Sequence, residues 1–174
     1  MTLAINTPFP LQFSTAYDDL CLSAHFRTRP EDFYVEEILG DSLSGEGEHL
    51  CLYIEKQGHN THWVTAELAR YAGIGERDIG VCGRKDRHAI TRQWFSLYDP
   101  SRKPIDWEQF DMEGTKIIAI KRHHKKLRLG SHAANRFVIR LRQVVSTACS
   151  PAQTLSDAEK ADVTLAIQQR LSQG

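Results

Sequence analysis

The stretch that decides the fold is HLCLYIEKQGHNTHWVTAELARYAG, residues 49–73. Its first part places Leu50, Leu52 and Ile54 at alternating positions, which predicts a half-buried strand. The GHNT that follows offers a turn and a helix N-cap, and Gly73 suits the cap at the far end. Between these signals the apolar spacing predicts an amphipathic helix whose buried face holds Trp63, Ala66, Leu68, Ala69, Tyr71 and Ala72.

Further strands are predicted after this helix. DIGVCG is a short strand, RKDRHA a loop and TRQWFSLY another strand, while KIIAIKR and RFVIRLRQV are two strands separated by a basic loop. In RFVIRLRQV one face is expected to carry Phe137, Ile139 and Leu141, and the other Arg136, Arg140 and Arg142. Strands interrupted by single helices predict an α+β (α/β) domain with a mixed, largely antiparallel sheet and flanking helices.

The bulk composition is that of a globular domain. The 174 residues are 41% hydrophobic and 25% charged, and no apolar run is long enough to span a bilayer. The segment MTLAINTPFPLQF lacks the charged and apolar regions of a secretory signal, and the four cysteines form no C-x-x-C pair. We therefore expect a cytoplasmic protein with reduced thiols, no membrane partner and no zinc knuckle.

Charge is strongly segregated, although the net charge is zero. Residues 31–55 hold eight acidic residues and no Lys or Arg, whereas residues 121–142 hold eight Lys or Arg and no acid. One interpretation is that the two blocks are solvated faces that pair with each other. The other is that the basic block follows a phosphate backbone, which would supply affinity and orientation rather than sequence choice.

Two apparent motifs are rejected. GEGEH (45–49) has glycines among acids and no G-K-[ST], so it is not a phosphate-binding loop. The histidine pairs 59/62 and 123/124 have no third His or Cys at useful spacing, so surface or RNA-facing histidines are favoured over a metal site. A metal-dependent hydrolase built on these histidines is therefore by far the least favoured function.

Asp86 is the carboxylate that stands out, in GVCGRKDRHAITRQWFSLY (80–98). It follows a glycine-flanked turn and lies between Lys85 and Arg87, whose positive charges favour its ionised form. Local chemistry alone leaves two alternatives, an exposed loop aspartate with solvated cations and a carboxylate held ready for reaction with an anionic substrate.

Four ordered blocks decide between them by resemblance. GRKDRHAITRQW resembles the G-x-K-D-[RK]-x-A-x-T-x-Q motif of the tRNA pseudouridine synthase D (TruD) family. RPEDFYVEE (29–37), GEGEHLCLYIEKQGHNT (45–61) and HHKKLRLGSHAANRF (123–137) are similar to other segments of that family, in the same order. The resemblance covers about residues 26–140 and implies a fold like part of the pseudouridine synthase catalytic domain.

The resemblance implies roles for particular residues. Asp86 would be the catalytic aspartate, and Asn135 and Phe137 the N-x-F pair, with the Phe137 ring stacked on the target uracil. Arg27 aligns with a basic residue near the active cleft. Lys85 and Arg87 would supply positive charge or contact the RNA backbone, rather than form a structural ion pair. In the basic block the expected RNA-backbone cations are Lys125, Lys126 and Arg128.

The implied reaction is isomerisation of uridine 13 of tRNA to pseudouridine, without metal or organic cofactor. An ionised Asp86 could attack C1′ as a nucleophile or remove a proton at C2′ as a base, and the sequence leaves both routes open. The partners expected are tRNA and the remaining half of such an enzyme. The alternative function is a catalytically inactive, truncated fragment that still binds RNA.

Two departures from the family pattern accompany the resemblance. Ala134 stands where the family usually has glycine before Asn135, and a F-G-x-x-R-F-G-type motif is absent. We expect residues 1–145 to form the N-terminal part of the catalytic domain and residues 146–174 a loop and amphipathic helix. Ser156 and Glu159 would form its capping box, and its apolar stripe would hold Val163, Ile167 and Leu171.

Overall fold

A computed structural model describes residues 22–146, 153–154 and 157–158. The chain divides into two compact units, one of residues 25–142 and one of residues 1–24 and 143–174. The larger unit contains one α-helix, α1 (Thr61–Ala72), among its described residues. Both the sheet and the helix of the sequence-based fold class are confirmed. The helix expected near residues 156–171 lies largely outside the described residues.

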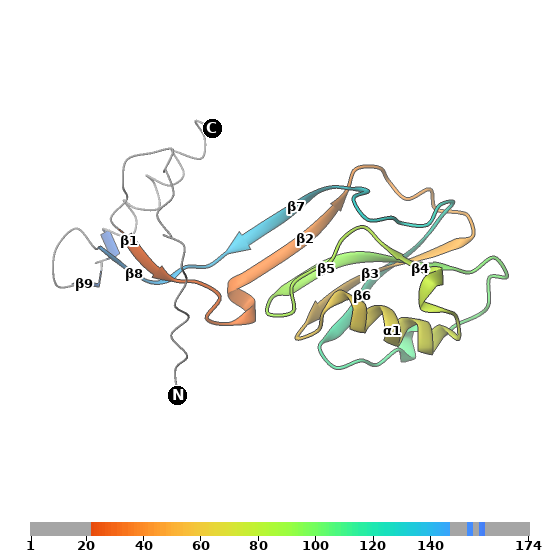
Figure 1. Ribbon diagram of the computed structural model, residues 1–174, viewed down its shortest axis with the longest axis horizontal. Coiled ribbons are helices and arrows are strands. Elements are labelled where there is room, and N and C mark those ends of the chain that lie inside the picture. The colour runs from red at the N-terminus through yellow and green to blue at the C-terminus, as the bar shows by residue number, and fades with distance from the viewer. Residues whose placement is uncertain (1–21, 147–152, 155–156, 159–174) are drawn as a thin grey trace, which may run out of the picture. The chain divides into compact units, whose positions relative to one another are not determined.

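The larger unit is built on a six-stranded sheet with the order β6-β3-β5-β2-β7 and with β4 paired to β5 (Figure 1). Only the β2–β5 pair is parallel. The strands are β2 (Phe33–Leu39), β3 (His49–Gln57), β4 (Ile79–Val81), β5 (Ile90–Tyr98), β6 (Thr115–His123) and β7 (His132–Ile139). Among the residues that the structure describes, three single-turn 3-10 helices cover Pro30–Asp32, Glu76–Asp78 and Trp107–Gln109.

Helix α1 (Thr61–Ala72) begins and ends at the predicted caps. The Asn60 side chain accepts a hydrogen bond from the Trp63 backbone N–H, and Gly73 ends the helix with a left-handed φ of 67°. The core beneath it joins the helix to β3 and β5 through Leu52, Ile54, Val64, Leu68, Phe95 and Leu97. The predicted face was wrong at Trp63, which is 54% exposed, because the buried stripe runs through Thr61, Val64 and Leu68 instead.

Along one of its edges, strand β5 pairs with two different strands. Its first residues, Ile90–Arg92, pair with β2, whereas Phe95–Leu97 pair with β4. The other edge pairs with β3 from Ile90 to Tyr98. A gap is therefore left around Trp94, between the end of one neighbour and the start of the next.

The acidic and basic blocks of the sequence are neighbours in the sheet, because β2 pairs with β7. Glu36 lies opposite Arg136 and forms an ion pair with it at 3.7 Å. Asp32 is buried and accepts two hydrogen bonds from the Arg142 guanidinium, at 2.6 Å and 2.7 Å. Mutual pairing therefore accounts for part of the charge segregation, while other basic residues stay exposed.

The Asp32–Arg142 pair predicts a loss of stability in acid. The hydrogen bonds from Arg142 hold the pKa of Asp32 below its ordinary value, so the carboxylate stabilises the fold above the unfolded pKa of about 4. This contribution is lost as the pH falls through the lower, folded-state pKa. Urea unfolding of the wild type and Asp32→Asn should show a large difference at pH 7 that shrinks below about pH 4. A difference of equal size at pH 7 and pH 3 would contradict this assignment.

RFVIRLRQV was predicted as one strand, and this prediction was wrong. β7 ends at Ile139, and β8 (Arg142–Ser146) begins after a break in which the Arg140 backbone N–H donates to the Asp32 carbonyl oxygen at 2.8 Å. The break follows from the charge pair, since Arg142 turns toward Asp32 rather than continuing the alternation of β7. β8 belongs to a separate three-stranded sheet with β1 (Leu22–His25) and β9 (Gln153–Thr154).

Two further observations concern the described residues alone. The cysteines among them, Cys51 and Cys82, carry free and buried thiols. No helix in this part of the chain is long and apolar enough to cross a membrane.

Candidate functional site

The loop between β4 and β5 carries Asp86 at the surface. The Asp86 side chain is 49% exposed, and its Oδ2 atom lies 3.4 Å from Nη2 of Arg27. Arg27 belongs to the segment between β1 and β2, which is 59 residues away in sequence. The fold therefore brings together two residues that the sequence analysis assigned to one site.

Arg27 also stacks on an aromatic cluster. Its guanidinium carbon lies 3.8 Å from the centroid of the Phe33 ring, within the range of a cation–π contact. The Phe33 ring in turn lies 5.9 Å from that of Phe137 on β7. Arg27 has a φ of 55°, a left-handed conformation that is uncommon for a residue with a side chain and that clusters at functional sites. Asp86, Arg27, Phe33 and Phe137 thus form one continuous cluster.

Asn135 and Phe137 share a face of β7, because side chains two residues apart point the same way. They lie opposite Glu37 and Val35 of β2, respectively. Phe137 is 53% exposed. The Nδ2 atom of Asn135 lies 3.1 Å from Nε2 of His132, while its buried Oδ1 atom meets no donor among the described residues. An unpaired buried acceptor of this kind marks Asn135 as a candidate for function.

Lys85 is not free to meet a substrate. Its ammonium lies 3.1 Å from Oε2 of Glu37, and the two side chains are 5% and 0% exposed. The preference for charge or RNA contact over a structural pair was therefore wrong for Lys85. The second oxygen of Glu37 accepts the Trp94 backbone N–H at 3.1 Å, which fills the gap between β2 and β4 along β5.

Two more buried side chains fix the Asp86 loop. The hydroxyl of Thr61 accepts the Lys85 backbone N–H at 2.8 Å and donates to Oε1 of Gln93 at 2.8 Å. Gln93 then donates through Nε2 to the Gly83 carbonyl oxygen at 3.1 Å. Sequence reasoning gave no role to Glu37, Thr61 or Gln93. The available signal was that all three lie inside the four quoted blocks, and that Glu37 continues the buried alternation of Phe33 and Val35.

Arg87, the residue that follows Asp86 in the loop, is exposed. Its Nε donates to the Gly58 carbonyl oxygen at 2.9 Å, and the Gly58 N–H donates back to the Arg87 carbonyl oxygen at 3.1 Å. A pocket of about 340 Å³ lies here, lined by Gly58, His59, Asn60, Trp63 and Arg87. Exposed Trp63 and the Arg87 side chain line this pocket together, so it offers a flat aromatic surface and a positive charge from the residue that follows Asp86.

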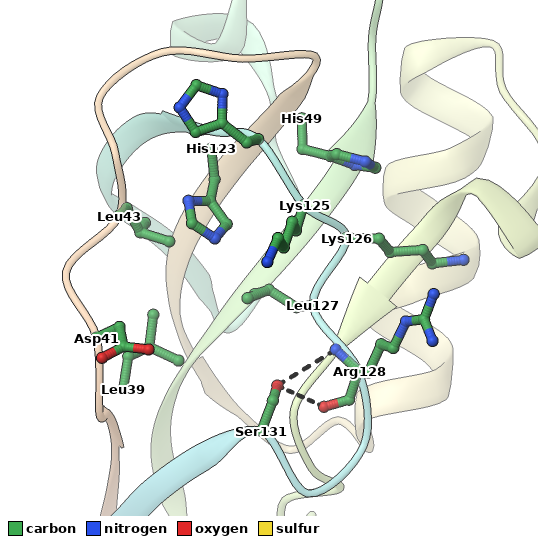
Figure 2. A pocket seen from close by; sticks show the side chains of 11 residues that line it. Leu39, Asp41, Leu43, His49, His123, Lys125, Lys126, Leu127, Arg128 and Ser131 are labelled. Atoms are coloured by element: carbon green, nitrogen blue, oxygen red, sulfur yellow. Dashed lines mark hydrogen bonds between the residues drawn. The ribbon is translucent and has the colours of Figure 1, made fainter.

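The basic loop between β6 and β7 is anchored to the sheet at Leu127. The Leu127 backbone N–H donates to the buried Ser96 hydroxyl at 2.9 Å. Gly80 permits this approach, since a Cβ atom there would lie 2.3 Å from the Leu127 carbonyl oxygen. Ser131 closes the loop by bonding the Arg128 backbone N–H and carbonyl oxygen, as Figure 2 shows.

A pocket of about 510 Å³ lies against this loop (Figure 2). Its lining is mostly basic, with Asp41 as the single carboxylate. The basic residues that line it are His49, His123, His124, Lys125, Lys126 and Arg128. Of the three cations assigned to RNA, Lys125 and Arg128 are exposed, whereas the Lys126 ammonium donates to the Arg77 carbonyl oxygen. In Figure 2 the Lys126 and Arg128 side chains extend away from Asp41.

The histidine pairs have other partners. Nε2 of His59 lies 2.9 Å from the Glu113 carbonyl oxygen, and Nδ1 of His123 accepts the Ser44 backbone N–H at 3.2 Å. His62 lies 3.6 Å from Glu76. No cluster of three or more His, Cys, Asp or Glu suited to a metal ion occurs within the described part of the chain.

Comparison with known proteins supplies the family. A family model for tRNA pseudouridine synthase D (TruD) matches residues 16–166. The chain belongs to the TruD family. The expectation drawn from the four sequence blocks is thereby confirmed.

Individual TruD relatives agree with this membership. The tRNA pseudouridine synthase D of Cellvibrio japonicus is 52% identical over 145 residues, covering 82% of this chain and 43% of the relative. That of Pseudoalteromonas translucida is 45% identical over 121 residues, covering 70% and 35%. The chain therefore spans between a third and somewhat over two-fifths of the length of the curated TruD relatives it matches.

A solved structure confirms the TruD fold. A crystal structure described as a candidate tRNA pseudouridine synthase D from Methanosarcina mazei matches with a TM-score of 0.61 and 29% identity. The match covers 71% of this chain and 29% of that protein. The mixed sheet with α1 against it is thus a TruD arrangement.

Proposed function

We propose that this chain carries the Asp86-bearing part of the active site of a tRNA pseudouridine synthase, which isomerises uridine to pseudouridine. The single observation that supports this most is the cluster of Asp86, Arg27 and Phe137. These residues come from three separate segments of the chain, and the family resemblance assigns all three to the site. TruD membership supplies the reaction class.

The proposed chemistry needs one carboxylate. In one route an Asp86 oxygen bonds to C1′ as the N1–C1′ bond breaks, and uracil leaves with the electron pair. C5 of the turned uracil then attacks C1′, Asp86 is displaced, and the C5 proton is lost. In the other route Asp86 removes the C2′ proton, N1–C1′ cleavage follows, and the proton returns to C2′ as C5 bonds to C1′, after which the C5 proton is lost. In both routes N1 of the product gains a proton from water. The exposed carboxylate beside Arg27 is compatible with both routes.

The aromatic cluster suits the intermediate stage of either route. A detached uracil must turn in place before it rejoins the sugar through C5, so it needs a surface that fixes its plane but not its orientation. The half-exposed ring of Phe137 offers such a face, and Asn135 lies on the same face of β7. Stacking on an aromatic ring is worth about 1–3 kcal/mol per base.

Exposed cations support tRNA as the substrate. Extruding a base from its stack costs a few kcal/mol, which phosphate contacts elsewhere offset. Lys125 and Arg128 on the basic loop and Arg87 beside Asp86 are placed to make such contacts, with Trp63 as a stacking surface near Arg87. The target that we assign is uridine 13 in the D-stem region, where RNA would be recognised by its shape and by the extruded base.

Binding of tRNA is expected to depend steeply on salt. Each lost phosphate contact reduces the slope of log K against log salt by about 0.7–0.9, so Lys125→Gln/Arg128→Gln should reduce it by roughly 1.4–1.8. Lys116→Gln is the matched control, because Lys116 is exposed at the opposite end of β6. Filter binding of tRNA across a salt series measures the slope. An unchanged slope in the double variant would remove these two residues from the RNA interface.

Activity is tested in a full-length context. We define the chimera as the Cellvibrio japonicus relative with its corresponding segment replaced by residues 22–146 of this chain. Release of tritium from tRNA labelled at uridine C5 reports the isomerisation, and the chimera should release it. The alternative, an RNA-binding fragment without catalysis, predicts that the 174-residue chain binds tRNA with strong salt dependence but releases no label. Turnover by the 174-residue chain itself would exclude that alternative.

A further inference from the structure

Lys56 on β3 is a buried lysine whose contacts are backbone carbonyl oxygens. It is 1% exposed, and its Nζ donates to the carbonyl oxygens of His59 at 2.8 Å, Asp86 at 2.9 Å and Lys85 at 3.4 Å. An ammonium has three N–H donors, so these three acceptors use its full capacity. Within the described part of the chain, no carboxylate lies at ion-pair distance from Lys56.

We propose that Lys56 is a positioning residue that holds the backbone of Asp86, so that the carboxylate is presented beside Arg27 and the Phe33–Phe137 rings. Two of its three acceptors are the carbonyl groups immediately before and after the Asp86 Cα atom. Both peptide planes around that atom are therefore tied to β3. The role of Lys56 in catalysis rests on the proposed function. Its hydrogen bonds to the backbone of the Asp86 loop do not.

The third contact extends the same hold to the neighbouring turn. The His59 carbonyl oxygen belongs to the turn that leads into α1, and Gly58 of that turn exchanges two hydrogen bonds with Arg87. Lys56 thus joins the strand, the turn and the loop through one cation. A buried ammonium is costly unless it is fully hydrogen-bonded, and hydrogen bonds from a charged donor are about twice as strong as neutral ones. Placing a lysine here is therefore explained by the carbonyl groups that it holds.

The charge on Lys56 depends on pH within a measurable range. Burial lowers its pKa to about 8, with Asp86 raising and Lys85 lowering it as the charged groups that face it. Among the described residues Asp86 is the charged group that offsets the burial, while Lys85 is itself paired with Glu37. Above that pKa the neutral amine has two donors for three carbonyl oxygens, and its lone pair meets the third.

Global stability and local order should therefore respond in opposite directions. A lysine whose folded pKa lies below its unfolded value of about 10.4 reduces stability while it is charged, and this cost disappears as the pH rises from about 8 to 10.4. The Asp86 loop, in contrast, loses a charge-assisted hydrogen bond on deprotonation. As the pH rises through about 8, we therefore expect the Asp86 loop to loosen while the contribution of Lys56 to the free energy of unfolding becomes more favourable.

The test uses two backbone amides that report on the loop in the 174-residue chain. The Lys85 N–H is bound to Thr61, and the Gly58 N–H to Arg87. NMR measures the hydrogen-exchange rate of each amide, and comparison with the intrinsic rate at the same pH gives its protection factor. This protection factor should fall about tenfold between pH 6.5 and 9.5, with a midpoint near 8. Amides of α1 at Leu68 and Ala69 should keep their protection.

The Lys56→Met variant removes the charge and keeps the length. It should show the loosened loop already at pH 6.5, with no midpoint near 8, while Lys116→Met behaves as the wild type. If Lys56→Met does not fold, the wild-type titration alone decides the question. Loop protection in the wild type that does not change across this pH range would overturn the proposal.

The effect of Lys56 on catalysis is measured in the chimera. Its kcat should fall above about pH 8 while KM for tRNA stays constant, and Lys56→Met should lower kcat at every pH without this midpoint. A loop that loosens without any change in kcat would overturn the positioning role. Failure of the proposed function is a different result, namely no turnover by the wild-type chimera at any pH, and the amide measurements then still decide whether Lys56 holds Asp86.

Discussion

Replacing Asp86 by asparagine in the chimera should lower turnover by on the order of a thousandfold or more, with tRNA binding changed only a few-fold. Asparagine keeps the size of the side chain but supplies neither a nucleophilic oxygen of useful strength nor a base. The Asp86 side chain is about half exposed and its ion pair with Arg27 is long, so the substitution should leave the fold intact. The loss would therefore report on chemistry.

The matched control for this substitution is Asp111→Asn. Asp111 is an exposed carboxylate in the loop before β6, so the same change of charge there should leave tritium release within about twofold of the wild type. Equal activity of the Asp86→Asn chimera and the wild-type chimera would remove Asp86 from the mechanism. A circular dichroism spectrum and a melting temperature for each variant separate loss of chemistry from loss of fold.

Lys85→Met should be the most destabilising single substitution in the Asp86 loop, by about 3–5 kcal/mol in the free energy of unfolding. The variant leaves the Glu37 carboxylate buried without its cation, although Glu37 must still accept the Trp94 backbone N–H. Removing one member of a buried pair is costly because the remaining charge has no water to solvate it. Urea unfolding at pH 7 measures the effect.

A second variant shows that the loss comes from the orphaned charge. Lys85→Met/Glu37→Gln keeps an acceptor for the Trp94 N–H but removes the buried carboxylate, so much of the lost stability should return. Lys116→Met, at an exposed lysine of β6, should change stability by no more than about 0.5 kcal/mol. A Lys85→Met variant within about 1 kcal/mol of the wild type would show that the pair contributes little to the fold.

The sequence predicted local structure well where a single physical signal was sufficient. The alternation in β3 and the caps at Asn60 and Gly73 depend on neighbouring residues alone, and the structure confirms them. Trp63 was misplaced because the apolar spacing fits two overlapping helix faces, and only packing against β3 and β5 selects the one through Val64. Long-range packing therefore decided what periodicity left ambiguous.

The site was predictable in its exposed members but not in its buried support. Asp86 and Phe137 lie in recognisable motifs and Arg27 lies just before one, and the structure places the three together. Lys85 looked like one of two equivalent flanking cations, because nothing near it in sequence shows that Glu37, 48 residues away, meets it in the core. Charged residues that serve the interior cannot be told from surface charges until the register of β2 and β5 is known.

The most direct test of the central claim is a single-label experiment on the chimera. The substrate is a tRNA whose only tritium lies at C5 of uridine 13, and the measurement is tritium released into water together with pseudouridine formed at that position. We predict one tritium released per pseudouridine, with release abolished in the Asp86→Asn chimera. A folded wild-type chimera that binds this tRNA with Asp86 intact but releases no tritium would contradict the assignment of Asp86 as the catalytic carboxylate.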